Sequence, residues 1–141
     1  FTSTGWDTPL GMGFFKSLPS VQSKYKTQFY DQLQQMNEVF ALQRLYESRN
    51  EWDKAMKVAT DNKNLLMWRT SYNRVQRKIQ QINRQIRLIE ADKKLSNAEI
   101  IDRVRQLNIV KNDIIRALIE QVLDYEKKTG ERVKRERWFT L

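Results

Sequence analysis

Apolar side chains recur with a regular spacing between residues 62 and 90 of the chain. The intervals between them alternate between three and four residues, at Leu65, Trp68, Tyr72, Val75, Ile79, Ile82, Ile86 and Ile89. This heptad spacing places all eight side chains on one face of an α-helix, whereas in a β-strand they would fall on both faces of a sheet. The pattern therefore predicts a long helix with a narrow apolar face for packing, and we call these eight residues the heptad seam.

A second apolar stripe predicts another long helix over residues 97–128. Its start is marked by Ser96 and Glu99, which have the spacing of a capping box, and Gly130 suits its C-terminal end. Its inward positions are Ile100, Val104, Leu107, Val110 or Lys111, Ile114, Leu118, Val122 and Tyr125. Four further apolar residues widen the stripe enough to contact two neighbours, namely Ile101, Ile115, Ile119 and Leu123. The connection of about five residues between the two long helices predicts that they pack antiparallel.

The N-terminal part of the chain predicts two more helices. Apolar residues at Tyr25, Phe29, Leu33, Met36 and Phe40 have helical spacing, so we expect a first helix over residues 21–47 with Ser20 or Ser23 as its N-cap. A shorter helix over residues 51–60 follows the break at residues 48–50. We therefore expect an all-α chain made of an extended apolar arm (1–19), two N-terminal helices (20–60), a long antiparallel helical hairpin (about 62–90 and 97–128, within 61–128) and a basic and aromatic tail (129–141).

Both ends of the chain carry aromatic residues that suit contact with a partner. Glycine and proline are concentrated in residues 1–19, which predicts an extended arm whose apolar side chains lie against a surface. The candidate partner anchors are Trp6, Phe14, Phe15, Trp138 and Phe139. For the last two, the alternatives are a partner groove, a membrane interface, or folding back onto the chain's own helices. The start at Phe1 and the connector-like residues 1–13 lead us to expect a piece of a longer chain.

The composition excludes several kinds of chemistry. The 141 residues include no histidine and no cysteine, which rules out imidazole bases, thiol nucleophiles and Cys/His zinc sites within this sequence. Neither a glycine-rich phosphate loop nor a nucleophile elbow is present. The acidic residues mostly alternate with lysine and arginine at outward positions, as in a solvated helix face. We therefore predict no enzyme activity for this segment, no metal, no cofactor and no small-molecule substrate.

Positive charge is concentrated on the first of the two long helices. The chain has a formal net charge of +9, and residues 61–88 hold seven positive residues and one negative, a balance of +6. Residues 1–60 hold seven positive and six negative residues, a balance of +1. Such charge attracts nucleic-acid phosphates, anionic lipid or acidic protein, and the candidate nucleic-acid contacts are Arg69, Arg74, Arg77, Lys78, Arg84 and Arg87. The alternative is that these residues, which occupy several outward positions, keep a long helix soluble.

The order of motifs along the chain resembles that of a phage protein family. After the apolar arm, the motifs are Phe-Tyr-Asp-Gln-Leu (29–33), Asn-Glu-Trp-Asp-Lys-Ala (50–55), the isoleucines Ile79, Ile82 and Ile86, and the turn with Leu95, Ser96 and Glu99. Over roughly residues 25–128, this order resembles the C-terminal helical module of the internal virion (ejection or core) proteins of short-tailed phages, of the large polyvalent protein-associated domain type.

The resemblance implies a structural or assembly role. Proteins of this family stack as rings inside the capsid above the portal, leave with the genome and help to build a conduit across the host envelope. It thus implies a location in the virion and later in the host cell envelope, with copies of the chain, other core and portal proteins, packaged DNA and the host membrane as partners. Some of these proteins carry a transglycosylase domain at the far N-terminal end, and no residue here matches it. The alternative hypothesis is a nucleic-acid-binding helical module that contacts DNA through a basic helix face.

Overall fold

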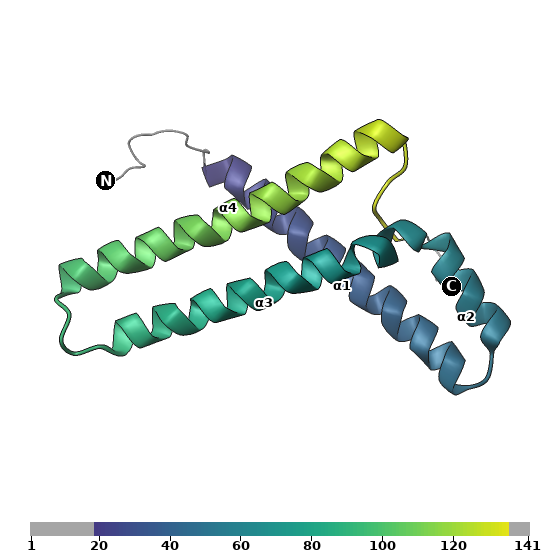
Figure 1. Ribbon diagram of the computed structural model, residues 1–141, viewed down its shortest axis with the longest axis horizontal. Coiled ribbons are helices and arrows are strands. Elements are labelled where there is room, and N and C mark those ends of the chain that lie inside the picture. The colour runs from purple at the N-terminus through teal and green to yellow at the C-terminus, as the bar shows by residue number, and fades with distance from the viewer. Residues whose placement is uncertain (1–18, 136–141) are drawn as a thin grey trace.

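The computed structural model describes residues 19–135, and these form four α-helices (Figure 1). The helices are α1 (Pro19–Ser48), α2 (Trp52–Asp61), α3 (Lys63–Ala91) and α4 (Asn97–Thr129). No strand occurs within the described range, which confirms the predicted all-α class, and each helix boundary lies within two residues of its predicted position. α1 begins at Pro19, a residue that suits a first helical turn because its missing N–H is not needed there. Ser20 and Ser23 therefore lie inside the helix, and the prediction that one of them is the N-cap is wrong.

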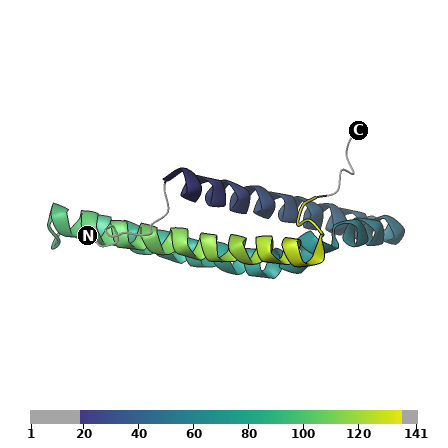
Figure 2. The same cartoon turned by 90° about the horizontal axis from the view of Figure 1, so that it is seen from above.

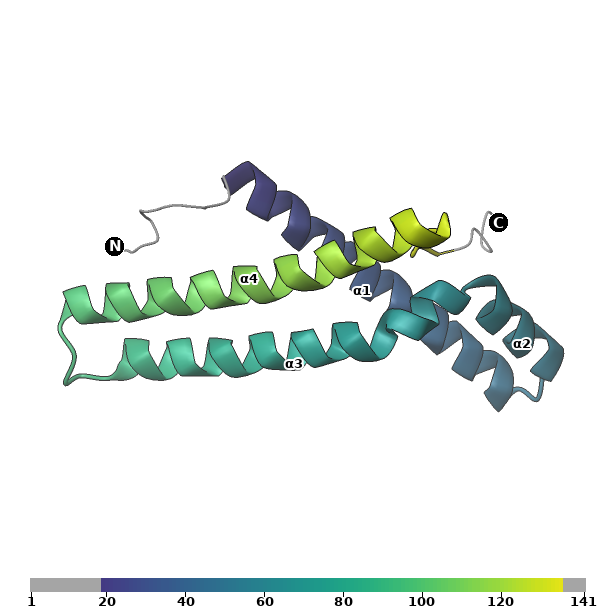
Figure 3. The same cartoon turned by 45° about the horizontal axis from the view of Figure 1, so that its top comes forward.

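α3 and α4 form the predicted antiparallel hairpin (Figures 1 and 3). The turn between them ends in the predicted capping box: the Glu99 N–H donates to Ser96 Oγ at 3.2 Å, and the Ser96 N–H donates to Glu99 Oε1 at 3.0 Å. These hydrogen bonds with Ser96 hold the pKa of the Glu99 carboxyl below its ordinary value. At the other end of α4, Gly130 adopts the left-handed conformation with a φ of 73°, which is costly for a residue with a Cβ. Local chemistry therefore fixes both ends of α4.

α1 and α2 form a second, shorter hairpin, and α1 lies against one face of the first hairpin. Figure 2 shows α1 as a separate layer over the α3–α4 hairpin, and α1 contacts both of its helices. Asn50, in the turn after α1, has a positive φ of 59°, a conformation that asparagine tolerates better than most residues. α1 covers only part of the length of the α3–α4 hairpin (Figure 1). Where α1 crosses, the molecule has two layers, and beyond it α3 and α4 project as a pair of helices.

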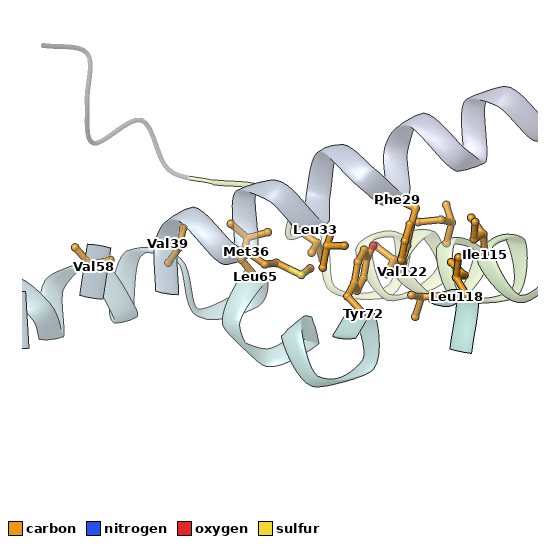
Figure 4. Packing of buried hydrophobic residues seen from close by; sticks show 13 residues of the cluster. Phe29, Leu33, Met36, Val39, Val58, Leu65, Tyr72, Ile115, Leu118 and Val122 are labelled. Atoms are coloured by element: carbon orange, nitrogen blue, oxygen red, sulfur yellow. The ribbon is translucent and has the colours of Figure 1, made fainter. Parts of the chain in front are cut away.

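The core lies where α1 crosses the hairpin (Figure 4). Its buried apolar side chains come from every helix and from the segment after α4: Phe29, Leu33, Met36, Val39, Val58, Leu65, Tyr72, Ile79, Ile115, Leu118, Ile119, Val122 and Val133. The rings of Phe29 and Tyr72 stack with centroids 5.3 Å apart and planes 9° apart. The Tyr72 hydroxyl donates a hydrogen bond to Gln32 Oε1, and Gln32 Nε2 donates to the Val133 carbonyl at 3.0 Å. Both ends of the buried Gln32 amide are thus satisfied, as buried polar groups require.

Residues 131–135 fold back over the end of α4 and complete this core. Val133 is 1% exposed, and its N–H donates to Glu126 Oε2 at 2.8 Å. The Arg135 N–H donates to Gln35 Oε1 at 2.9 Å, and the Arg135 guanidinium pairs with Glu38. Sequence patterning places these residues in the basic tail, because a single valine among charged residues shows no periodicity. In the structure, this segment ties the end of α4 to α1.

We expect the Val133→Ala variant to lose about 2 kcal/mol of unfolding free energy, because it removes two buried methyl groups and leaves a cavity beside α1. Urea titration followed by circular dichroism measures this change. The neighbouring Lys134 is exposed, so Lys134→Ala is the matched control and should change the unfolding free energy by less than about 0.5 kcal/mol. Equal unfolding midpoints for the two variants would contradict a buried Val133.

The Tyr72→Phe variant should lose about 1–2 kcal/mol of unfolding free energy, because it leaves Gln32 Oε1 buried without a donor. Burial also raises the pKa of Tyr72 above its ordinary value by disfavouring the phenolate, and Glu126 adds to the effect. Because the folded-state pKa lies above the unfolded value of about 10, the contribution of neutral Tyr72 to stability is complete below about pH 10 and is lost as the pH rises further.

Unfolding free energies measured across this alkaline range should therefore fall more steeply for the wild-type chain than for Tyr72→Phe. Tyr30, which is 42% exposed, provides the control: Tyr30→Phe should keep the steep fall of the wild-type chain. Parallel pH profiles for the wild-type chain and Tyr72→Phe would count against a buried, hydrogen-bonded phenol.

Candidate protein-interaction surface

The structure places the heptad seam along the inner side of α3, with burial that decreases toward the turn. Four seam residues are buried, with exposed fractions of 0%, 0%, 4% and 9% for Leu65, Tyr72, Ile79 and Ile82. The other four are half-buried: Trp68, Val75, Ile86 and Ile89. Trp68 meets Tyr125 of α4 edge-on, with ring centroids 5.7 Å apart. The seam is therefore part of the core at one end of the hairpin and thins toward the other end.

The part of the hairpin beyond α1 is a projection of two helices (Figure 3). We call it the projecting arm and define it as residues 79–91 of α3, the turn, and residues 97–111 of α4. No residue of α4 in this range is buried, because the buried residues of α4 begin at Ile115, where α1 lies over the hairpin. Two helices alone cover one narrow face of each other, so apolar side chains outside that face stay in solvent. On the projecting arm these are Leu88, Ile101 and Val110, which are 71%, 57% and 43% exposed.

The apolar pattern of α4 allows either Val110 or Lys111 at one inward position. In the structure, Lys111 takes this position. Its ammonium group donates to Asn83 Oδ1 across the hairpin at 2.8 Å, whereas Val110 is exposed. Burial lowers the pKa of Lys111 below its ordinary value, and Lys26 of α1 lowers it further. A polar pair thus interrupts the apolar seam at the base of the projecting arm.

Five of the six candidate nucleic-acid contacts are exposed on α3, namely Arg74, Arg77, Lys78, Arg84 and Arg87. No salt bridge joins any of these five to another residue of the described chain. By contrast, cations on α2 and α4 pair with acids one turn away, such as Lys57 with Asp61 at 3.0 Å. A set of like charges without local partners raises the local potential and suits an anionic partner.

Arg69, the sixth candidate, does not belong to this exposed set. Its guanidinium carbon lies 3.7 Å from the centroid of the Phe40 ring of α1, which is a cation–π contact. Its Nε is buried and forms no hydrogen bond with the described residues. Arg69 thus packs α3 against α1, and the prediction that it contacts nucleic acid stays a prediction. Its heptad position could not reveal this, because the contact comes from another helix.

The predicted aromatic anchors lie outside the described residues, and so do residues 1–18 of the predicted arm; the anchors are Trp6, Phe14, Phe15, Trp138 and Phe139. Near the described C-terminal segment, a groove of about 500 Å³ lies between α1, α4 and residues 132–134. Most of the residues that line it are polar or charged, and they include Lys24, Asp31 and Glu126. Glu126 already accepts the hydrogen bond from the Val133 N–H, so this carboxylate holds the C-terminal segment in place.

Within residues 19–135, no group of three or more acidic side chains is placed to hold a metal ion. The same stretch of chain contains no helix with both the length and the apolar character needed to span a membrane. Comparison of the chain with protein-family models, with curated proteins and with solved structures finds no match in any of the three. A functional proposal therefore depends on the projecting arm, on its exposed side chains and on the order of motifs along the sequence.

Proposed function

We propose that this chain is a structural assembly module that binds protein partners through its projecting arm. The observation that supports this most directly is the incomplete burial of the arm, which leaves Leu88, Ile101 and Val110 in solvent. Apolar side chains that a two-helix arm leaves exposed are typical of surfaces that a partner covers. At the other end of the hairpin, α1 provides such cover for Ile115 and Ile119 of α4. A partner that binds the projecting arm would bury its exposed apolar side chains, as α1 buries those of the core.

We further propose that the module belongs to an internal virion protein, of the ejection or core type, of a short-tailed phage. The order of motifs along the sequence supports this context, because it resembles that family over most of the chain. In this role the module acts by assembly and not by catalysis. Inside the capsid its partners are copies of itself and neighbouring core or portal proteins, with which it takes part in genome ejection through the host envelope.

A second candidate function is nucleic-acid binding, which the exposed cations of α3 favour. Arg74, Arg77, Arg84 and Arg87 have no ion-pair partner among the described residues, so their charge is available to phosphate groups. Packaged DNA is the anionic polymer that such a row would meet inside a capsid. This function and the assembly role differ in their partner and can be tested separately.

Self-association of the 141-residue chain tests the assembly role. We expect sedimentation equilibrium over the micromolar range to give masses above the 17.0 kDa monomer that rise with concentration. Replacing Leu88, Ile101 and Val110 by serine should weaken association by about tenfold or more, because each exposed apolar group loses its cover in the complex. The matched control, Trp52→Ser with Met56→Ser, alters exposed apolar residues of α2 and should associate normally. A wild-type chain that remains monomeric throughout would contradict the assembly role.

Charge reversal tests the second candidate. Replacing Arg74, Arg77, Arg84 and Arg87 by glutamate should abolish retention of duplex DNA while helix content, measured by circular dichroism, stays unchanged. Retention by the wild-type chain should fall steeply with salt, because phosphate neutralisation releases counterions. Reversal of Lys24, Lys26, Arg49 and Lys134, which are exposed elsewhere, is the control for net charge. A flat salt dependence, or full retention by the α3 variant, would rule out this function.

A further inference from the structure

The outward side of α3 carries a row of positive residues. Intervals of three and four residues place Arg74, Arg77, Gln81, Arg84 and Leu88 on the side of the helix opposite the heptad seam, and all five are exposed. We call this row the α3 edge. It contains three arginines and no acidic residue.

The outward side of α4 differs from the α3 edge, because it carries acidic residues interspersed with arginines. We call four of its exposed acids, Glu99, Asp102, Asp113 and Glu120, the α4 edge. Cations lie among these acids: Arg103 and Arg105 are exposed, and Arg116 lies 3.5 Å from Asp113 on the same helix. Glu120 accepts a hydrogen bond from the Tyr25 hydroxyl at 3.3 Å, and this contact is exposed. Exposed charge interactions of this kind contribute little, so these acids can exchange their present partners for new ones at small cost.

We propose that the α3 edge of one copy of this chain packs against the α4 edge of a second copy. The inference rests on the proposed assembly function, and it names the partner and the two surfaces. Charge complementarity carries it: two carboxylates of the α4 edge, Asp113 and Glu120, can come level with the three arginines of the α3 edge. A nucleic acid would bind the α3 edge but not the α4 edge, whereas a second copy of the chain would contact both edges.

The register of the hairpin shows that these charges can meet. Within one copy, Lys111 is bonded to Asn83, and this contact fixes which residues of α3 and α4 are level with each other. A second copy placed beside the first, antiparallel helix to helix and in the same register, brings Glu120 level with Arg74. Asp113 then falls between the other two arginines of the α3 edge. The long side chain of arginine reaches a carboxylate one turn away, so small axial shifts are tolerated.

Apolar and turn residues support the same contact. Leu88 lies in the α3 edge with 71% of its surface exposed, and Val110 lies beside the α4 edge with 43% exposed. Burying a leucine side chain stabilises a contact more than an exposed charge pair does. At the tip of the arm, the turn carries the exposed Lys93 and Lys94 next to the exposed Asp92.

A contact between two different edges is heterologous and does not close on itself in a dimer. A copy that has used its α3 edge still presents its α4 edge to a third copy. Association therefore continues beyond the dimer, which an interface between two identical surfaces would not allow. The mass distribution in solution reports this difference directly.

Two charge-reversed chains test the edge contact. One carries Arg74→Glu, Arg77→Glu and Arg84→Glu, and the other carries Asp102→Lys, Asp113→Lys and Glu120→Lys. In sedimentation equilibrium at low salt, each chain alone should associate with itself about tenfold more weakly than the wild-type chain, or worse. An equimolar mixture of the two should regain association, because the reversed edges are again complementary. Recovery in the mixture also shows that both variants are folded.

A third variant, with Lys24→Glu, Arg49→Glu and Lys134→Glu, changes the net charge as the first does but leaves both edges intact, and should associate like the wild-type chain. A mixture that remains monomeric would overturn the edge contact. Reversal of the α3 edge that abolishes retention of duplex DNA without changing the mass distribution would overturn it in favour of nucleic acid. A wild-type chain that never associates would instead remove the assembly function itself, so the two failures are distinguishable.

Discussion

The contact between Phe29 and Tyr72 fixes where the two hairpins of this molecule meet. Stacked rings with nearly parallel planes place the Tyr72 hydroxyl beside Gln32, one turn along α1, and Gln32 in turn holds the Val133 carbonyl. Three segments that are far apart in the sequence are thus joined at one point. Sliding α1 along the hairpin would leave buried polar groups without partners, at a cost of about 1–3 kcal/mol for each group. The position of α1, and hence the length of arm that it leaves uncovered, follows from this contact.

Features that depend on neighbouring residues could be predicted from the sequence, and features that depend on distant ones could not. The heptad spacing predicts α3, the Ser96–Glu99 capping box predicts where α4 begins, and Gly130 predicts where α4 ends. The crossing of α1 lies beyond such patterns, because each helix has an apolar stripe and spacing does not say which stripes meet. Val133 shows the same limit: a single apolar residue among charged ones carries no periodic signal, although it is almost fully buried.

The interaction surface could be predicted in part for the same reason. Outward heptad positions correctly indicate that Arg74, Arg77 and Arg84 are exposed, because one helix determines which of its faces is turned away from its partner. Arg69 lies on the side of α3 that α1 covers, and its stacking on Phe40 depends on the crossing that spacing does not specify. The acids of the α4 edge are exposed in the structure, and they remain interspersed with arginines there as they are along the sequence.

The Lys111–Asn83 pair explains how an arm with so small a core keeps a single alignment. A seam of isoleucines alone tolerates a shift of one heptad, because each step brings similar side chains opposite one another. A lysine bonded across the hairpin favours one register, at the cost of desolvation that its lowered pKa reflects. With the register fixed, the charged residues on the outer sides of α3 and α4 keep a constant spacing relative to each other. The Lys111–Asn83 pair therefore interrupts the apolar seam where the core ends, but it fixes the register of the projecting arm. A fixed register is necessary for a surface that contacts a partner along its whole length.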